Sequence, residues 1–182
     1  SAWIKSDDGI PSGYNAICGM RANSDEDRCQ FHIIPLGKIH AHYKSNTNGT
    51  AAITASAVFA NGVTAWTHVV FVVGTALVDI YVNNTKQTID GTNDGDISGA
   101  TKSDFDSNSR NFYIGARNDS GTADDFFDGK IDEVAIFNKA LTQAEITSLY
   151  AADPQNAGDA VGITNLIGYW KFDEGTGEPQ DT

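Results

Sequence analysis

The sequence is poor in cysteine, proline and basic residues. Its 182 residues include two Cys, four Pro and twelve Lys plus Arg, against 24 Asp plus Glu, so the formal net charge is −12. Without a Lys/Arg cluster, the chain gains little from releasing the counterions of a phosphate backbone. We therefore expect no nucleic acid partner. The same charge argues against binding to an anionic membrane surface.

Long hydrophobic runs are also missing. The longest apolar stretch, residues 69–78, is interrupted by Gly74 and Thr75. It is far shorter than the roughly 20 apolar residues that cross a bilayer as a helix, so no membrane insertion is expected. No signal peptide is visible. The chain starts without Met, and residues 2–4 resemble the middle of a strand, which predicts a fragment or a processed product.

The two cysteines cannot form a zinc site alone, and no C-x-x-C motif is present. Cys18 and Cys29 fall in two expected strands on either side of the polar turn 23–26. A tight turn there would place them opposite each other. A cross-strand disulfide would then be feasible and would suit an oxidising compartment. Two reduced, half-buried thiols are the alternative, and the sequence does not choose between them.

Short alternating segments separated by turns make up most of the chain. In residues 38–44, for example, Ile39, Ala41 and Tyr43 share one side. The pattern predicts an all-β, antiparallel two-sheet sandwich. We expect strands near residues 1–5, 15–21, 28–34, 37–44, 51–58, 66–73, 76–83, 86–89, 111–116, 130–137 and 166–172.

One short helix is expected near residues 142–151. Thr142 stands three residues before Glu145, which is the spacing of a capping box. Apolar residues follow at helical spacing, and Asp153-Pro154 ends the helix.

Residues 129–146, G-K-I-D-E-V-A-I-F-N-K-A-L-T-Q-A-E-I, resemble the closing motif of the laminin-G-like, concanavalin A-like lectin/glucanase superfamily. Further segments resemble other strands of that family and occur in family order, at residues 1–5, 66–70, 78–83 and 112–115. The resemblance implies a jelly-roll sandwich with one short helix. It says less about function, because the superfamily includes lectins, adhesion modules, pentraxins and glycosidases.

The resemblance also suggests a domain organisation. Residues 1–152 are predicted to form the sandwich, and residues 153–165 a linker. Residues 166–182 begin with a segment that resembles the opening strand of such a domain, although here it follows the closing helix. This segment either folds back on the sandwich or starts a second domain. We favour the fold-back, because an exposed aromatic strand would leave a sheet edge and a large apolar area in water.

Catalysis is not expected. Glycosidases of this superfamily carry an E-x-D-x-x-E pattern on one strand, and retention needs two carboxyl groups roughly 5–5.5 Å apart. The best acidic pair here is Asp132-Glu133, whose side chains point to opposite faces of a strand. We expect Asp132 to bond a nearby turn. Other catalytic motifs, such as G-x-S-x-G and H-E-x-x-H, are also lacking.

An acidic loop, residues 117–128, is the best candidate for a metal site. Four carboxylates lie within ten residues, and calcium takes oxygen ligands of this kind. Several family members bind calcium on the equivalent rim. The ligands that the resemblance implies are Asn118, Asp119, Asp124 and Asp125. A solvated acidic turn is the alternative. A second loop, residues 90–96, is weaker because Thr101 stands where a calcium loop needs Glu.

Sugar binding normally uses an aromatic platform with polar groups around it. His40 and His42 share one face of a strand and are candidates for contact with a sugar or a metal. The candidate tyrosines are Tyr14, Tyr43, Tyr81 and Tyr113. We assign Tyr81 and Tyr113 to the carbohydrate site with the two histidines. A core role is the alternative for each aromatic residue.

These features favour a non-catalytic, lectin-like recognition or adhesion module on an extracellular, cell or virion surface. Its expected partner is a glycan or cell-surface polysaccharide, with calcium as the expected cofactor. The alternative is a purely structural fibre, coat or decoration module, whose partners would be other subunits of a surface or virion assembly. A glycosidase is disfavoured, because no paired carboxylates were found.

Overall fold

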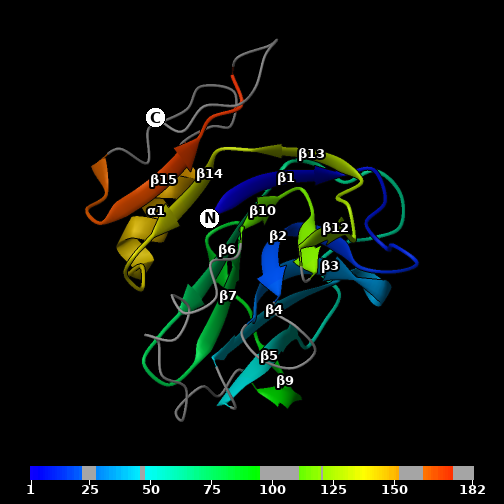
Figure 1. The fold of residues 1–182 in the computed structure, drawn as a ribbon, viewed down its shortest axis with the longest axis horizontal. Helices are drawn as coiled ribbons and strands as arrows, with labels where there is room; N and C mark the ends of the chain where they lie inside the picture. The colour runs from blue at the N-terminus through cyan, green and yellow to red at the C-terminus, as the bar shows by residue number, and fades with distance from the viewer. Residues whose placement is uncertain (22–27, 46–47, 95–110, 120, 152–161, 174–182) are drawn as a thin grey trace.

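The computed structural model describes residues 1–21, 28–45, 48–94, 111–119, 121–151 and 162–173. In this part of the chain, two β-sheets pack face to face and one short helix covers the smaller sheet (Figure 1). The predicted all-β, two-sheet sandwich with one short helix is confirmed. No helix among the described residues is long and apolar enough to cross a membrane.

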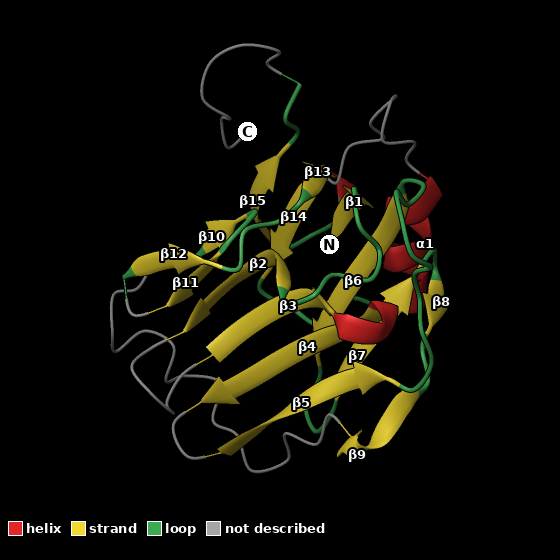
Figure 2. Ribbon diagram, turned by 90° about the vertical axis from the view of Figure 1, so that its right-hand side faces the viewer, coloured by secondary structure: helices red, strands yellow, loops and turns green. Residues whose placement is uncertain are grey.

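The two main sheets have the strand orders β13-β1-β6-β7-β8 and β12-β11-β2-β3-β4-β5-β9, with β10 also paired to β2. Figure 2 looks onto the second, larger sheet, with the smaller sheet behind it. The elements are β1 Ala2–Ser6, β2 Asn15–Arg21, β3 Arg28–Ile34, η1 Pro35–Gly37, β4 Lys38–Ser45, β5 Asn48–Thr54, β6 Thr67–Val73, β7 Val78–Val82, β8 Thr85–Lys86, β9 Ile89–Asp94, β10 Tyr113–Ile114, β11 Arg117–Asp119, β12 Thr122–Asp124, β13 Gly129–Asp132, β14 Val134–Phe137, α1 Gln143–Ala151 and β15 Leu166–Trp170.

The core lies between the inner faces of the two sheets. Successive strand residues point to opposite faces, so alternate apolar residues meet there. Ile33 and Ile39 come from the large sheet, and Ile4, Val69 and Ile80 from the small one, all at 0% exposure. Full burial of each such side chain stabilises the fold by about 1.5–3 kcal/mol before entropy is counted.

A glycine lets the closing strand join the small sheet. β13 pairs antiparallel with β1, and Gly129 lies opposite Ser6. Gly129 has a φ of 144°, and a Cβ atom there would lie 2.2 Å from the carbonyl oxygen of Lys5. Only glycine accepts this close backbone approach without strain.

The helix packs on the outer side of the small sheet. Ile146 and Leu149 are buried with Tyr81 in a second hydrophobic cluster. The predicted capping box is present: Glu145 Oε2 accepts a hydrogen bond from the Thr142 N–H at 2.9 Å, and the Glu145 N–H donates to Thr142 Oγ1 at 3.3 Å. The helix therefore begins at the expected place and buries its apolar stripe.

The C-terminal aromatic segment lies against the closing strand. β15 pairs antiparallel with β14, with Val134 opposite Trp170, and Tyr169 is 1% exposed in the second hydrophobic cluster. The strand thus extends the apolar layer under the helix. Most of the predicted linker (residues 153–161 of 153–165) and the end of the C-terminal segment (residues 174–182) lie outside the described residues.

Of the two alternatives for the cysteines, the structure has the reduced thiols and not the disulfide. Cys18 and Cys29 are free thiols, because the register places Cys18 opposite Phe31 and Cys29 opposite Met20. The two cysteines are diagonal neighbours on one face, and the hydrophobic pattern that keeps Phe31 in the core holds this register. Burial raises the pKa of Cys18 to about 11 and that of Cys29 to about 12, so both thiols stay protonated at neutral pH.

A buried carboxyl group marks the junction between β13 and β14. Glu133 is 9% exposed, has a φ of 50°, and accepts a hydrogen bond from the Tyr169 hydroxyl. Its own N–H donates to Asp132 Oδ1 at 2.9 Å, so Asp132 bonds the local turn as expected. Burial raises the pKa of Glu133, although the hydrogen bond from Tyr169 opposes the shift.

We predict that Glu133→Gln stabilises the protein at neutral pH and has little effect at pH 4. A raised carboxyl pKa means that the folded state holds its proton more tightly, so stability falls as pH rises above the ordinary value of 4.5. Glutamine keeps an acceptor for Tyr169 without the buried charge. The expected gain at pH 7 is about 1 kcal/mol, measured by urea unfolding. An equal effect at both pH values would contradict this prediction, and Glu133→Ala is the control that loses the hydrogen bond at both.

Candidate functional site

The outer face of the large sheet, which points away from the core, carries a group of polar side chains. The antiparallel register of β3 and β4 places His32 opposite His40 and Gln30 opposite His42. Because paired residues share a face, these four side chains lie together, while Phe31 points to the core from the same strand. With Tyr14 they form what we call the histidine face.

Tyr14 covers part of this face from the loop before β2. Its ring stacks on His32 with a centroid distance of 5.3 Å and an interplanar angle of 1°, and lies 6.1 Å from the His40 ring. The His40 and His42 rings are 5.5 Å apart. Since Tyr14 remains 46% exposed, it presents an aromatic surface to solvent directly above the histidines.

Tyr113 belongs to the same face. It lies opposite Gly19, which in turn lies opposite Gln30 on the other side of β2. Tyr113 therefore shares a cross-strand row with Gln30 and His42. Three of the four residues that we assigned to a carbohydrate site, His40, His42 and Tyr113, are thus on one face of one sheet.

The fourth residue, Tyr81, is not on this face. It is 8% exposed and lies in the cluster beneath α1, where its ring contributes to packing. The assignment of Tyr81 to a sugar platform is therefore wrong, because the helix covers it. Tyr43 is likewise a core residue, at 5% exposure.

Two polar side chains of the histidine face are buried without hydrogen bonds. His32 is 0% exposed and Gln30 is 3% exposed. Among the described residues, neither the two ring nitrogens of His32 nor the Nε2 atom of Gln30 has a hydrogen-bond partner. Burial and then the neighbouring His40 lower the pKa of His32 well below its ordinary value, so its ring is neutral. Buried polar groups are normally paired, so this unused capacity needs a reason.

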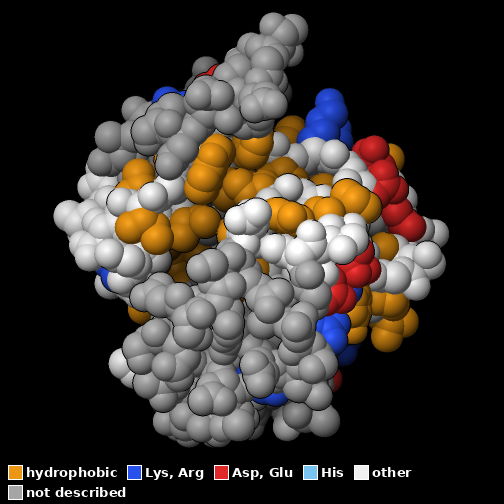
Figure 3. Space-filling model, viewed as in Figure 1, with side chains coloured by type: hydrophobic (Ala, Val, Ile, Leu, Met, Phe, Trp, Pro, Cys, Tyr) orange, Lys and Arg blue, Asp and Glu red, His pale blue; other side chains and the backbone are white. Residues whose placement is uncertain are grey.

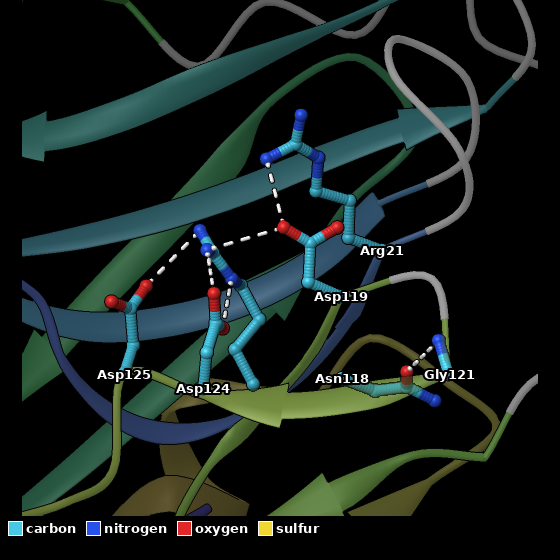
Figure 4. A network of polar contacts seen from close by, with 7 residues as sticks. Arg21, Asn118, Asp119, Gly121, Asp124 and Asp125 are labelled. Atoms are coloured by element: carbon cyan, nitrogen blue, oxygen red, sulfur yellow. Dashed lines mark hydrogen bonds and ion pairs between the residues drawn. The ribbon is translucent and has the colours of Figure 1, made fainter.

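The acidic loop has a different centre from the one expected. The guanidinium of Arg117 donates to Asp124 through Nε at 2.9 Å and Nη2 at 2.7 Å, and pairs with Asp125 at 3.1 Å (Figure 4). Asp119 lies 3.5 Å from both Arg117 and Arg21. The three carboxylates therefore do converge, and they converge on an arginine.

The electrostatics of the cluster follow from this geometry. Burial disfavours the charge of Arg117, but hydrogen bonds to Asp124 and the charges of Asp125 and Asp119 outweigh it and raise the Arg117 pKa. Burial raises the pKa of Asp125, while Arg117 pulls it down. The cluster is a largely self-neutralised ion-pair network at the edge of the sheet.

This arrangement does not fit a calcium ion as it stands. Arg117 holds the position toward which the carboxylates point, and Asn118 directs its side chain elsewhere: its Oδ1 accepts the Gly121 N–H at 2.8 Å, and its Nδ2 donates to the Asn111 carbonyl at 2.6 Å. Within the described segments, no group of three or more His, Cys, Asp or Glu side chains could hold a metal ion. A calcium ion could bind here only if Arg117 moved away. The second candidate calcium loop, residues 90–96, is only partly described by the structure, because residues 95–96 lie outside the described residues.

Reasoning from the sequence missed His32, Gln30 and the position of Tyr14. Alternation around residue 40 revealed His40 and His42, but the pairing of His32 with His40 depends on the strand register. No pattern in the sequence indicates that a loop tyrosine stacks on that histidine.

We predict that His32→Phe reduces the sensitivity of the fold to acid. Because the folded-state pKa of His32 is lowered, its contribution to stability is complete above about pH 6.5 and is lost as pH falls below that value. Phenylalanine keeps a ring under Tyr14 and does not titrate. The difference in unfolding free energy between variant and wild type should grow in favour of the variant by about 1 kcal/mol from pH 7.5 to 5.5.

Urea unfolding at the two pH values measures this difference. His68, whose pKa burial lowers to about 3, is untouched and should keep some acid sensitivity in both proteins. Parallel pH dependence of variant and wild type would show that His32 does not contribute.

The fold agrees with the family that the sequence matches. The family model for the concanavalin A-like lectin/glucanases superfamily, of laminin G type, matches residues 1–147. Among solved structures, an S-layer domain-containing protein from Clostridium thermocellum ATCC 27405 is similar, with 19% sequence identity and a TM-score of 0.37. The match covers 77% of this chain and 64% of that one, so the chain spans less than two thirds of its neighbour.

No curated protein matches the chain. The likeness to the S-layer domain-containing protein is too distant to carry an argument about function. The family model is different, because it covers most of the sequence and agrees with the two-sheet architecture. The chain belongs to the concanavalin A-like lectin/glucanase superfamily.

Proposed function

We propose that the chain is a non-catalytic, lectin-like module that binds a glycan on the histidine face. The observation that carries this proposal is an exposed aromatic ring, Tyr14, stacked above buried polar groups of His32 and Gln30 that have no hydrogen-bond partner among the described residues. Polar groups that fix ligand orientation beside an aromatic surface are typical of a ligand site.

The chemistry of a sugar suits this combination. A pyranose ring has an apolar C–H face that packs on an aromatic ring, and hydroxyl groups at its edge that both donate and accept hydrogen bonds. A neutral imidazole offers one donor and one acceptor, and a glutamine amide offers both as well. His42 and Tyr113 extend the same row on the sheet and would contact a second sugar unit.

The acidic residues support a binding role rather than hydrolysis. Asp132 bonds the N–H of Glu133, and Glu133 is bonded to Tyr169 at the β13–β14 junction. Asp119, Asp124 and Asp125 are engaged by Arg117. We accordingly propose that the module binds its glycan without hydrolysing it. With a cell-surface polysaccharide as its ligand, the module would act in adhesion outside the cell, on a cell or virion surface.

Screening on a glycan array, followed by calorimetry with the best ligand, tests the proposal. Tyr14→Ala should weaken binding at least tenfold, because it removes the stacking surface, which corresponds to about 1.4 kcal/mol. His42→Ala should weaken it less. Leu77→Ala is the matched control, since Leu77 is also exposed, at 49%, but lies in the turn between β6 and β7 of the other sheet. Saturable binding that is equal in all three variants would refute the histidine face.

A different outcome would favour the structural alternative. If no glycan binds while the protein assembles with other subunits of a surface or virion structure, the module is a fibre, coat or decoration component. Analytical ultracentrifugation of the chain with its candidate assembly partners distinguishes the two cases.

Calcium dependence is tested through Arg117. We expect millimolar calcium or EDTA to leave the wild-type melting temperature unchanged, because Arg117 already occupies the position among the three carboxylates. Arg117→Gln should lose about 2 kcal/mol of stability through carboxylate repulsion, and calcium should restore part of the loss. A calcium-dependent rise in the melting temperature of the wild-type protein would show instead that the ion displaces Arg117.

A further inference from the structure

An apolar cavity of about 580 Å³ opens between the two sheets, on the opposite side of the large sheet from the histidine face. Its walls come from the inner faces of both sheets, including Phe31 and Phe71, and from β14 and the loop after it, including Phe137. Figure 3 shows hydrophobic side chains gathered around a hollow on this side of the molecule. The cavity volume falls within the range of about 300–1,000 Å³ that is usual for small-molecule sites.

The charge of the cavity wall differs from that of the protein. The chain has 24 Asp plus Glu and a net charge of −12, yet no carboxylate is among the described residues that line the cavity. The one charged side chain among them is Lys139, and its ammonium is ion-paired with Glu145, which does not line the cavity. An anionic head group at the mouth would therefore approach the ammonium side of this ion pair and meet no carboxylate of the cavity wall.

Lys139 still has a hydrogen-bond donor to offer. Its Nζ bonds Glu145 and also donates to Thr164 Oγ1 at 3.1 Å. An ammonium group has three N–H donors, so one more acceptor can be bound. The side chain is also partly exposed, at 26%, which leaves it accessible from the solvent.

The two free cysteines add to the apolar character of the wall. Cys18 and Cys29 both line the cavity. Burial raises the pKa of each thiol well above neutral pH, so both are uncharged. A protonated, partly buried cysteine behaves as a small hydrophobic residue. The thiols therefore suit an alkyl chain and also report on whether the cavity is filled.

We propose that this cavity binds a long-chain fatty carboxylate, with the alkyl chain between the sheets and the carboxylate at Lys139. The half-open shape suits a ligand with one apolar end and one charged end, because the chain leaves water while the head group stays at the mouth. The cavity and the histidine face lie on opposite sides of the large sheet, and Gln30, which belongs to the histidine face, also lines the cavity. We expect fatty-acid binding not to depend on glycan binding.

Titration with cis-parinaric acid, a fluorescent fatty acid, tests the site in the whole chain. We expect saturable one-to-one binding below the critical micelle concentration, and displacement by palmitate. Hexadecanol, which lacks the charge, should displace the acid at least fivefold less well. In Lys139→Met, palmitate and hexadecanol should displace cis-parinaric acid equally well. A general loosening of α1 would weaken the binding of both ligands and leave the ratio of their affinities unchanged. Absence of saturable binding, or an unchanged ratio in this variant, would overturn the proposal.

Cys29→Phe fills the cavity and should abolish binding of cis-parinaric acid without lowering the melting temperature, while Leu77→Ala should bind it like the wild type. Glycan binding retained by Cys29→Phe would keep the two sites distinct. If Cys29→Phe does not fold, thiol protection in the wild-type protein replaces it. Palmitate should slow the alkylation of Cys18 and Cys29 by N-ethylmaleimide at least fivefold, and equal rates with and without palmitate would refute the site.

Discussion

Packing of alternate side chains between two pleated sheets is the constraint on which the rest of the molecule depends. Because every second residue of β3 and β4 is committed to the core, the residues between them are forced to the outer face, whatever their polarity. Phe31 and Ile33 face inward, and Gln30 and His32 must then face outward. The histidine face is thus a direct consequence of core packing in the same two strands.

The edges of the sandwich are closed by specific backbone features. Gly129 allows β13 to approach β1, and the C-terminal strand β15 pairs with β14 while Tyr169 fills the space beneath the helix. Glu133, at the junction, bears a left-handed backbone and a buried carboxyl group that Tyr169 satisfies. These features add a second hydrophobic cluster outside the small sheet, and apolar burial in this cluster holds the helix against the sheet. The capping box stabilises the first turn of the helix itself.

The charged side chains of this acidic protein are distributed unevenly over the fold. Arg117 gathers three carboxylates at one edge of the large sheet, while the cavity between the sheets has Lys139 and no carboxylate among its described lining residues. The same chain therefore presents three chemically different regions: an aromatic and imidazole face, an ion-pair network centred on Arg117, and an apolar cavity with one charged side chain in its wall. Each follows from which strand residues the fold brings together.

Local patterns were sufficient for the architecture. Period-two alternation, the spacing of Thr142 and Glu145, and Gly129 at the start of the closing strand depend on neighbouring residues, and these predicted the strands, the capped helix and the family. The candidate site could not be predicted from such local patterns. A register that differs from the expected one separates Cys18 from Cys29 into diagonal positions, and the same pairing brings His32 beside His40. Helix packing buries Tyr81, and Arg117 occupies the centre of the acidic loop. Such outcomes depend on contacts between distant segments, which the order of residues along the chain does not encode locally.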